Sequence, residues 1–97
     1  MCHVTRSLSV VGDRWTLLIL WMLSRDVHRF DQIQTNAGIA PNILTQRLRR
    51  MEQDGIVDRR PYQDRPRRFE YHATAKGRAL NGVLLLLRDW GAEHGGA

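Results

Sequence analysis

The sequence predicts a mainly α-helical domain with one small β-hairpin. Four segments carry the apolar spacing and the capping residues of helices: 14–23, 29–36, 41–54 and 75–91. Two segments between the third and fourth helices, 56–62 and 69–73, instead alternate β-branched or aromatic residues with polar ones, as strands do. The polar segment 63–68 between them has the composition of a hairpin loop.

Length and composition bound the kind of protein. The 97 residues form one small domain, 1–97, whose core is marginal without a partner. The single cysteine, Cys2, excludes an intrachain disulfide and the usual multi-cysteine zinc sites. No signal peptide opens the chain, and no apolar run approaches the ~20 residues that span a bilayer. We therefore expect a cytoplasmic protein without a membrane partner.

The charge indicates an anionic partner. The net charge is +5, and fourteen arginines accompany a single lysine, Lys76. A basic excess favours nucleic acid or an anionic surface, and the forked guanidinium suits phosphate and guanine. The four histidines are scattered without an acidic companion at metal spacing, so we expect no metal and no cofactor.

The first predicted helix is too apolar for a small domain to bury alone. A weakly apolar segment, 4–11, ends at Gly12, and Asp13 then has the character of an N-cap. Apolar residues surround nearly the whole helix 14–23, which indicates burial on most sides. Part of this surface belongs to the core, and the excess predicts a partner surface.

Segment 29–54 has the pattern of a helix-turn-helix. Phe30 and Ile33 face inward in the short first helix, Gly38 suits a positive φ in the turn, and Ile39 is a buried plug. Pro41 at the first helical position and Gly55 after the last delimit the second helix. In such motifs the second helix enters the major groove, although helical hairpins with glycine turns also occur in ordinary bundles.

The second helix has one apolar and one polar face. Leu44, Leu48 and Met51 form a narrow apolar stripe. The opposite face carries amide, hydroxyl and guanidinium groups, the types that pair with base edges and phosphates: Asn42, Thr45, Gln46, Arg49, Arg50 and Gln53. Arg47 lies at the apolar edge, where we expect it to pack and pair with an acid. The alternative for the polar face is an ordinary solvated surface.

The hairpin adds a basic tip. Two strands that directly follow a recognition helix make a winged helix-turn-helix, with the wing at 56–73. Arg65, Arg67 and Arg68 lie in the loop, where we expect them to clamp phosphates or enter the minor groove. A solvated loop is the alternative, but such loops usually balance positive charge with acids.

The last predicted helix begins after the N-cap Thr74 and runs to about residue 91, with 91–97 frayed. Its apolar stripe covers almost half the circumference, and Leu85 points to the other side. A monomer would expose this patch, so we predict a dimer interface. With the first helix it contains Trp15, Leu18, Trp21, Val83, Leu84, Leu87 and Trp90.

An ordered series of motifs carries a family resemblance. They are Trp15-Thr16-Leu17-Leu18-Ile19-Leu20, Arg29-Phe30-Asp31-Gln32-Ile33, Gly38-Ile39-Ala40-Pro41, Leu44-Thr45-Gln46-Arg47-Leu48-Arg49, Asp54-Gly55-Ile56-Val57, Glu70-Tyr71 and Thr74-Ala75-Lys76-Gly77-Arg78. The set resembles the HxlR-type winged helix-turn-helix transcriptional regulators of bacteria, in the MarR-like superfamily. The resemblance implies a homodimer, built from the N- and C-terminal helices, that binds an operator near a promoter.

The resemblance also suggests roles for two residues. Cys2 occupies the place of a cysteine that senses oxidants or electrophiles in members of this group, and Arg29 would lie near a DNA phosphate. Two positions depart from the family pattern. His3 stands where proline commonly follows the cysteine, and Ala40 replaces the Ser or Thr that would cap the recognition helix, which loses about 1 kcal/mol.

The sequence therefore predicts a bacterial regulator that binds double-stranded DNA as a homodimer on a palindromic operator, with a small oxidant or electrophile as effector through Cys2. It predicts no catalysis. One alternative is a winged-helix module whose basic wing docks an acidic protein. A thiol enzyme is a weaker alternative, because Cys2 has no paired base or second thiol in a recognisable motif.

Overall fold

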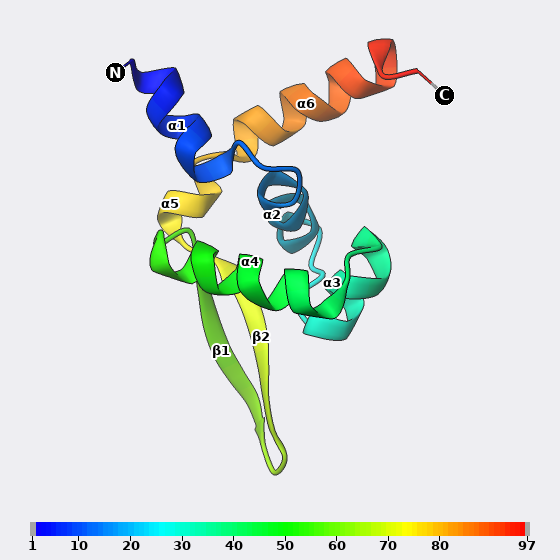
Figure 1. Cartoon of the computed structure of the whole chain (residues 1–97). Coiled ribbons are helices and arrows are strands. Elements are labelled where there is room, and N and C mark those ends of the chain that lie inside the picture. The colour runs from blue at the N-terminus through cyan, green and yellow to red at the C-terminus, as the bar shows by residue number, and fades with distance from the viewer. Residues whose placement is uncertain (1, 97) are drawn as a thin grey trace.

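The computed structural model describes residues 2–96 and contains six helices and one antiparallel hairpin (Figure 1). The elements are α1 (His3–Val11), α2 (Thr16–Ser24), α3 (Phe30–Ala37), α4 (Pro41–Gln53), β1 (Val57–Asp64), β2 (Arg67–Ala73), α5 (Ala75–Arg78) and α6 (Asn81–His94). This confirms the predicted fold class, a mainly helical winged helix-turn-helix. No helix among the described residues is long and apolar enough to cross a membrane.

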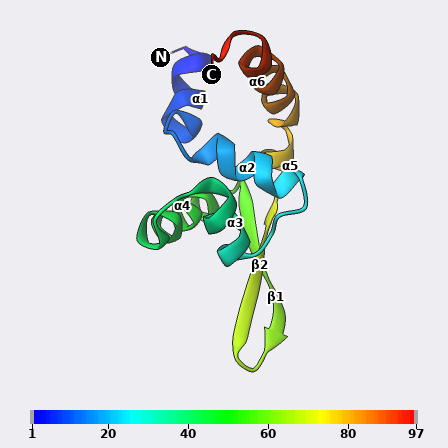
Figure 2. The same ribbon diagram turned by 90° about the vertical axis from the view of Figure 1, so that its right-hand side faces the viewer.

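The elements separate into two ends around α2. The wing β1–β2 projects from one end, beside α3 and α4, and α1 and α6 lie at the other end (Figures 1 and 2). The molecule is elongated, with extents of 45 × 35 × 23 Å. The wing and the terminal helices are thus available to different partners.

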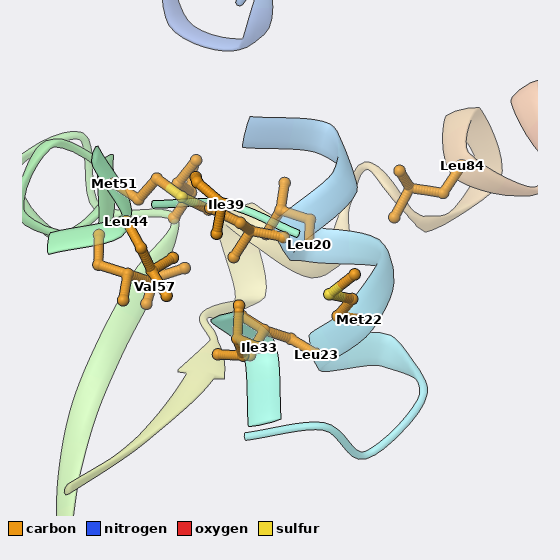
Figure 3. Close-up of a cluster of buried hydrophobic side chains, with 12 residues drawn as sticks. Leu20, Met22, Leu23, Ile33, Ile39, Leu44, Met51, Val57 and Leu84 are labelled. Atoms are coloured by element: carbon orange, nitrogen blue, oxygen red, sulfur yellow. The ribbon is translucent and has the colours of Figure 1, made fainter. Parts of the chain in front are cut away.

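The core joins α2 to the helix-turn-helix and the base of the wing. Ile19 of α2, Ile33 of α3 and Leu44 of α4 are fully buried, and Val57 brings the start of β1 into the same cluster. From α6 only Leu84 is buried, and Figure 3 shows its side chain pointing toward α2. The core therefore fixes α4 and the wing more firmly than it fixes α6.

The sequence predicts Asp13 as the N-cap of α2, but that position belongs to Trp15, and Asp13 binds the start of the helix from two residues earlier. Its carboxylate accepts hydrogen bonds from the backbone N–H groups of Trp15 (2.9 Å) and Thr16 (3.0 Å) and from the Thr16 hydroxyl. Partial burial raises the pKa of Asp13, but these hydrogen bonds and the Arg47 charge outweigh it and hold the pKa below its ordinary value. Arg47 Nε lies 3.4 Å from the Asp13 carboxylate, so it pairs with an acid, as expected. Asp13 therefore links α2 to α4.

The turn of the helix-turn-helix also has the predicted conformation. Gly38 closes α3 with a φ of 66°, and Ile39 is 3% exposed. Pro41 begins α4, and Ala40 supplies no side-chain cap. Gly55 follows α4 with a φ of 75°, which any residue with a Cβ adopts at a cost.

The C-terminal helix differs from the prediction, because it is two helices. The Thr74 hydroxyl donates to the Gly55 carbonyl at 2.6 Å and caps α5 by accepting from the Gly77 N–H. A Cβ on Gly77 would lie 2.2 Å from the Ile56 carbonyl oxygen, so α5 touches the chain before the wing. These contacts hold α5 against the chain before the wing. The helix axis changes direction between α5 and α6 (Figure 1).

Other predicted boundaries also differ. Segment 4–11 is a helix, α1, rather than an undefined apolar segment. α2 begins at Thr16, two residues later than expected, and α6 continues to His94 instead of fraying after Trp90. The strands extend through most of the predicted loop and leave only residues 65 and 66 as the turn. Of the three arginines predicted for the loop, only Arg65 lies in this turn, and Arg67 and Arg68 belong to β2.

Candidate nucleic-acid interface

The buried stripe of α4 fixes what the helix presents to solvent. Leu44, Leu48 and Met51 are at most 1% exposed, so the opposite side of the helix faces outward. Five of the six residues predicted to contact DNA are exposed: Asn42, Gln46, Arg49, Arg50 and Gln53. The sixth, Thr45, is half-buried, and its hydroxyl donates to the Pro41 carbonyl at 2.9 Å. Because its hydroxyl is engaged within the helix, Thr45 presents mainly its methyl group to an external partner.

Ion pairs distinguish the arginines of α4. Arg50 Nε lies 3.1 Å from Asp54, one turn along the chain. Arg49 has no carboxylate within 4.0 Å among residues 2–96. A charge that the protein does not neutralise attracts an external anion more strongly. Arg49 is thus the cation of this face best placed for a ligand.

The wing tip carries the densest uncompensated charge of the interface. Arg65, Arg67 and Arg68 are exposed, and in the described part of the chain none has a carboxylate within 4.0 Å. The Arg67 guanidinium lies 5.5 Å from the centre of the Phe69 ring, which orients it. Arg67 and Arg68 also line a cleft together with Phe30 of α3 and Thr45 of α4, while the far end of the hairpin extends away from the helices (Figure 2).

Arg29 lies between the helix-turn-helix and the wing. Its Nε is 3.7 Å from a Glu70 carboxylate oxygen, and its guanidinium is 4.2 Å from the centre of the Tyr62 ring. It borders a cleft of about 430 Å³ between α3, α4 and the wing, and half of its side chain stays accessible. The lining residues are Arg29, Phe30, Asp31, Thr45, Tyr62, Arg67, Arg68, Phe69 and Tyr71.

The structure adds two residues that the sequence did not single out. Ile43 is 38% exposed on α4, outside the buried stripe, and apolar groups at such positions contact the thymine methyl in the major groove. The sequence did carry a signal for Ile43, because this apolar residue lies outside the apolar stripe of its helix. Tyr62 lines the cleft and stacks with Arg29. Tyr62 lies at an irregularity in the strand register between Pro61 and Gln63, which the sequence pattern does not predict.

The opposite end of the molecule is apolar. Val83, Leu87 and Trp90 of α6 are 44%, 49% and 62% exposed. Trp15, Leu18 and Trp21 are half-buried. A hollow of about 270 Å³ between α2 and α6 is lined by Leu17, Leu18, Trp21, Leu84, Leu87 and Arg88.

Three further residues alter the predicted partner surface at this end. Leu84 is 4% exposed and packs within its own chain, so it serves the core rather than an outer surface. Residues outside the predicted set are exposed as well, among them Leu86 of α6 at 71% and Leu8 of α1 at 57%. The apolar surface therefore extends over both terminal helices.

Cys2 caps α1 through its sulfur. Sγ accepts a hydrogen bond from the Thr5 backbone N–H at 3.3 Å and lies 3.1 Å from the Thr5 hydroxyl. The hydroxyl contact, followed by the backbone contact, lowers the pKa of the fully exposed Cys2 thiol. Among the described residues, no group of three or more His, Cys, Asp or Glu side chains is placed to hold a metal ion.

Similarity to known protein sequences extends over most of this chain. The HxlR-like helix-turn-helix family profile matches residues 10–97. An uncharacterised HTH-type transcriptional regulator of Mycobacterium tuberculosis is 44% identical over 91 residues, covering 94% of this chain and 58% of that protein. The chain thus spans less than two thirds of that relative. The HTH-type transcriptional regulator YtcD of Bacillus subtilis is 37% identical over 92 residues, covering 94% of this chain and 73% of that protein.

Solved structures share the fold along the whole chain. The crystal structure of a regulator named YtcD superposes with a TM-score of 0.87 at 36% identity, covering 97% of each chain. The oxidised form of the redox regulator HypR superposes with a TM-score of 0.86 at 33% identity, covering 96% of this chain and 97% of that one. Because the family profile and these likenesses extend over nearly all of its length, the protein belongs to the HxlR-like helix-turn-helix family.

Proposed function

We propose that this chain is a transcriptional regulator that binds double-stranded DNA as a homodimer on a palindromic operator. The observation that carries the proposal is that the exposed amide and arginine face of α4 adjoins a wing tip with three uncompensated arginines. Base-reading groups and phosphate-binding groups are the two kinds of contact that sequence-specific recognition requires. The names of the relatives, HTH-type transcriptional regulators, agree with this proposal.

The two parts of the interface have different roles in this proposal. Asn42, Gln46 and Arg49 of α4 read base edges in the major groove, with Thr45 offering its methyl group to thymine and Arg50 and Gln53 at the margin. Arg65, Arg67 and Arg68 bind phosphates or enter the adjacent minor groove, and Arg29 binds a phosphate at the rim of the cleft. In DNA binding the protein supplies positioning and charge, without covalent chemistry.

Gln46→Ala tests the base-reading role of α4. Gln46 is exposed opposite the buried stripe, and a bidentate amide–adenine pair discriminates against other bases by about 1–3 kcal/mol. We expect the variant to lose preference at one position of each half-site, with little change in its affinity for random duplex. Competition titrations with single-base operator variants measure this. Equal losses on operator and random DNA would contradict the assignment.

The dimer half of the proposal rests on the exposed apolar residues of α1, α2 and α6. A two-fold dimer presents the same patch from both subunits, so this surface would be covered in the functional protein. The two recognition helices would then contact half-sites about one helical turn, or ~34–36 Å, apart. A palindromic operator follows from this symmetry.

We further propose that Cys2 senses oxidants or electrophiles. One solved structure to which this chain is similar is named a redox regulator and is known in oxidised and reduced forms. The contact with Thr5 favours the thiolate of Cys2, the form that reacts. With one cysteine in the chain, oxidation by diamide joins the Cys2 residues of two chains, or joins Cys2 to a small thiol, while diamide takes up the two electrons and two protons.

Operator binding should therefore weaken on treatment with diamide or a quinone. It should recover with a reductant only in the disulfide form, and the operator affinity of Cys2→Ser should be unchanged by both reagents.

Thr5→Val keeps the thiol but removes its strongest stabilising contact, so the pKa of Cys2 should rise toward its ordinary value. The pH at which alkylation reaches half its maximal rate should rise with it. If Cys2→Ser loses affinity on oxidation as readily as the parent, Cys2 is not the sensor.

A further inference from the structure

Arg59, near the base of the wing, contacts two elements that the proposed interface must hold together. We infer that Arg59 is a positioning residue that fixes the angle between the wing and the recognition helix α4. The inference rests on the proposed function for its consequence, because that angle decides whether one duplex can contact both parts at once.

The contacts of Arg59 bridge the two parts. Its Nε lies 3.7 Å from a Glu52 carboxylate oxygen on α4, and its guanidinium lies 4.3 Å from the centre of the Phe69 ring on β2. Arg67, at the tip side of the same strand, lies 5.5 Å from that ring. A single side chain on β1 thus ties α4 to the strand that carries two of the uncompensated arginines.

The position of Glu52 supports this role. It lies in the last turn of α4, where the helix dipole disfavours a carboxylate, so helix stability does not account for it. Its carboxylate lies instead within 3.7 Å of Arg59 Nε. In the hairpin register Arg59 stands opposite Tyr71, and burial, followed by the Glu52 charge, raises the pKa of the Tyr71 phenol. The ion pair with Arg59 thus places the Glu52 carboxylate against the base of the wing.

The wing is held similarly from the side of α3. Arg29 pairs with Glu70 of β2 at 3.7 Å and stacks on Tyr62 of β1 at 4.2 Å. Each contact is individually weak at an exposed site.

The base of the wing is also held by the backbone, since the Tyr71 N–H donates to the His28 carbonyl at 2.8 Å, and by Val57 in the core. Among the ion pairs of the described residues, that of Arg59 with Glu52 is the one that joins the wing to α4.

The adjacent residue provides a matched control. Arg60 carries the same charge, and its side chain is 54% exposed against 49% for Arg59. Its Nε lies 3.0 Å from Asp58 on its own strand, and no ion pair joins it to α4 among the described residues. Arg59→Gln and Arg60→Gln thus remove the same charge at neighbouring sites, and only the first removes the link to α4.

Residual dipolar couplings of backbone amides test the link without DNA. In the parent and in Arg60→Gln we expect the couplings of α4 and of β1–β2 to fit one alignment tensor. In Arg59→Gln the couplings of the wing should fit only a separate alignment tensor of smaller amplitude, while the tensor fitted to α4 stays the same. The double variant Glu52→Arg/Arg59→Glu should restore a single tensor. A single tensor for Arg59→Gln overturns the inference.

A double-mutant cycle on operator DNA tests the consequence. We expect Arg68→Ala to weaken operator binding about fivefold in the parent and in Arg60→Gln. In Arg59→Gln the same substitution should weaken binding less than about twofold, because the wing of that variant already contacts DNA poorly. The same factor in all three backgrounds overturns the positioning role. If the parent binds no duplex, the proposed function fails by itself, and the dipolar couplings alone decide whether Arg59 holds the wing.

Discussion

Leu87→Asp should give a folded monomer that does not bind the operator. The Leu87 side chain lines the hollow between α2 and α6 and is 49% exposed in the isolated chain, so an aspartate there reaches water and the chain should still fold. In a two-fold dimer both aspartates would be buried without partners, at about 3–5 kcal/mol for each uncompensated charge. Operator affinity should fall at least about a hundredfold, since one recognition helix alone reads half of the site.

Leu85→Asp is the matched control for this result. Leu85 is also a leucine of α6 and is 45% exposed, but it borders a different hollow from Leu87, one lined by Trp21, Ser24, Arg25, Asn81 and Leu84. It should remain dimeric and bind DNA. Sedimentation velocity at micromolar concentration, with thermal unfolding as the check on folding, distinguishes the two. A dimeric Leu87→Asp that binds normally would refute the predicted interface.

Removing Arg67 and Arg68 together should weaken binding to all duplexes alike. The slope of log K against log salt falls by about 0.9 for each phosphate that the protein no longer neutralises, so two arginines in each of two subunits account for a change of about 3.6. These side chains have no carboxylate partner within 4.0 Å in the described chain, so alanine leaves no acid unpaired and folding should be unaffected. Affinity should decrease equally for operator and random DNA, in contrast to Gln46→Ala.

Arg6→Ala controls for a simple loss of net charge. Arg6 is exposed on α1, at the end of the molecule opposite the wing (Figure 2). We expect its removal to leave the salt slope unchanged within the error of the titration. A double variant of Arg67 and Arg68 with the parental slope would show that the wing does not contact phosphates.

The helix-turn-helix was predictable because local signals determine it. Gly38 closes α3, Pro41 opens α4 and Asp13 accepts hydrogen bonds from the first backbone N–H groups of α2, and each acts on its own neighbours in sequence. The apolar stripe of α4 has the period of a helix, so its solvent face followed without the tertiary structure. The exposed positions of Asn42 and Gln46 are consequences of that stripe.

The rest depends on contacts between distant segments. The break between α5 and α6 follows from the approach of Gly77 to the Ile56 carbonyl, which no local pattern reveals. Whether Leu84 or Leu87 faces the core depends on how α6 packs on α2, because both belong to one apolar stripe. The link from Arg59 to Glu52 likewise requires the wing to lie beside the end of α4.

Selection of duplexes from a random pool tests the central claim most directly. The unmutated protein should enrich an inverted repeat whose half-site centres lie about one helical turn, or ~34–36 Å, apart, and mutation of either half-site should weaken binding. That result requires base reading and two-fold symmetry together. Repeated rounds that enrich no common sequence, with binding that depends only on duplex length and salt, would contradict the account.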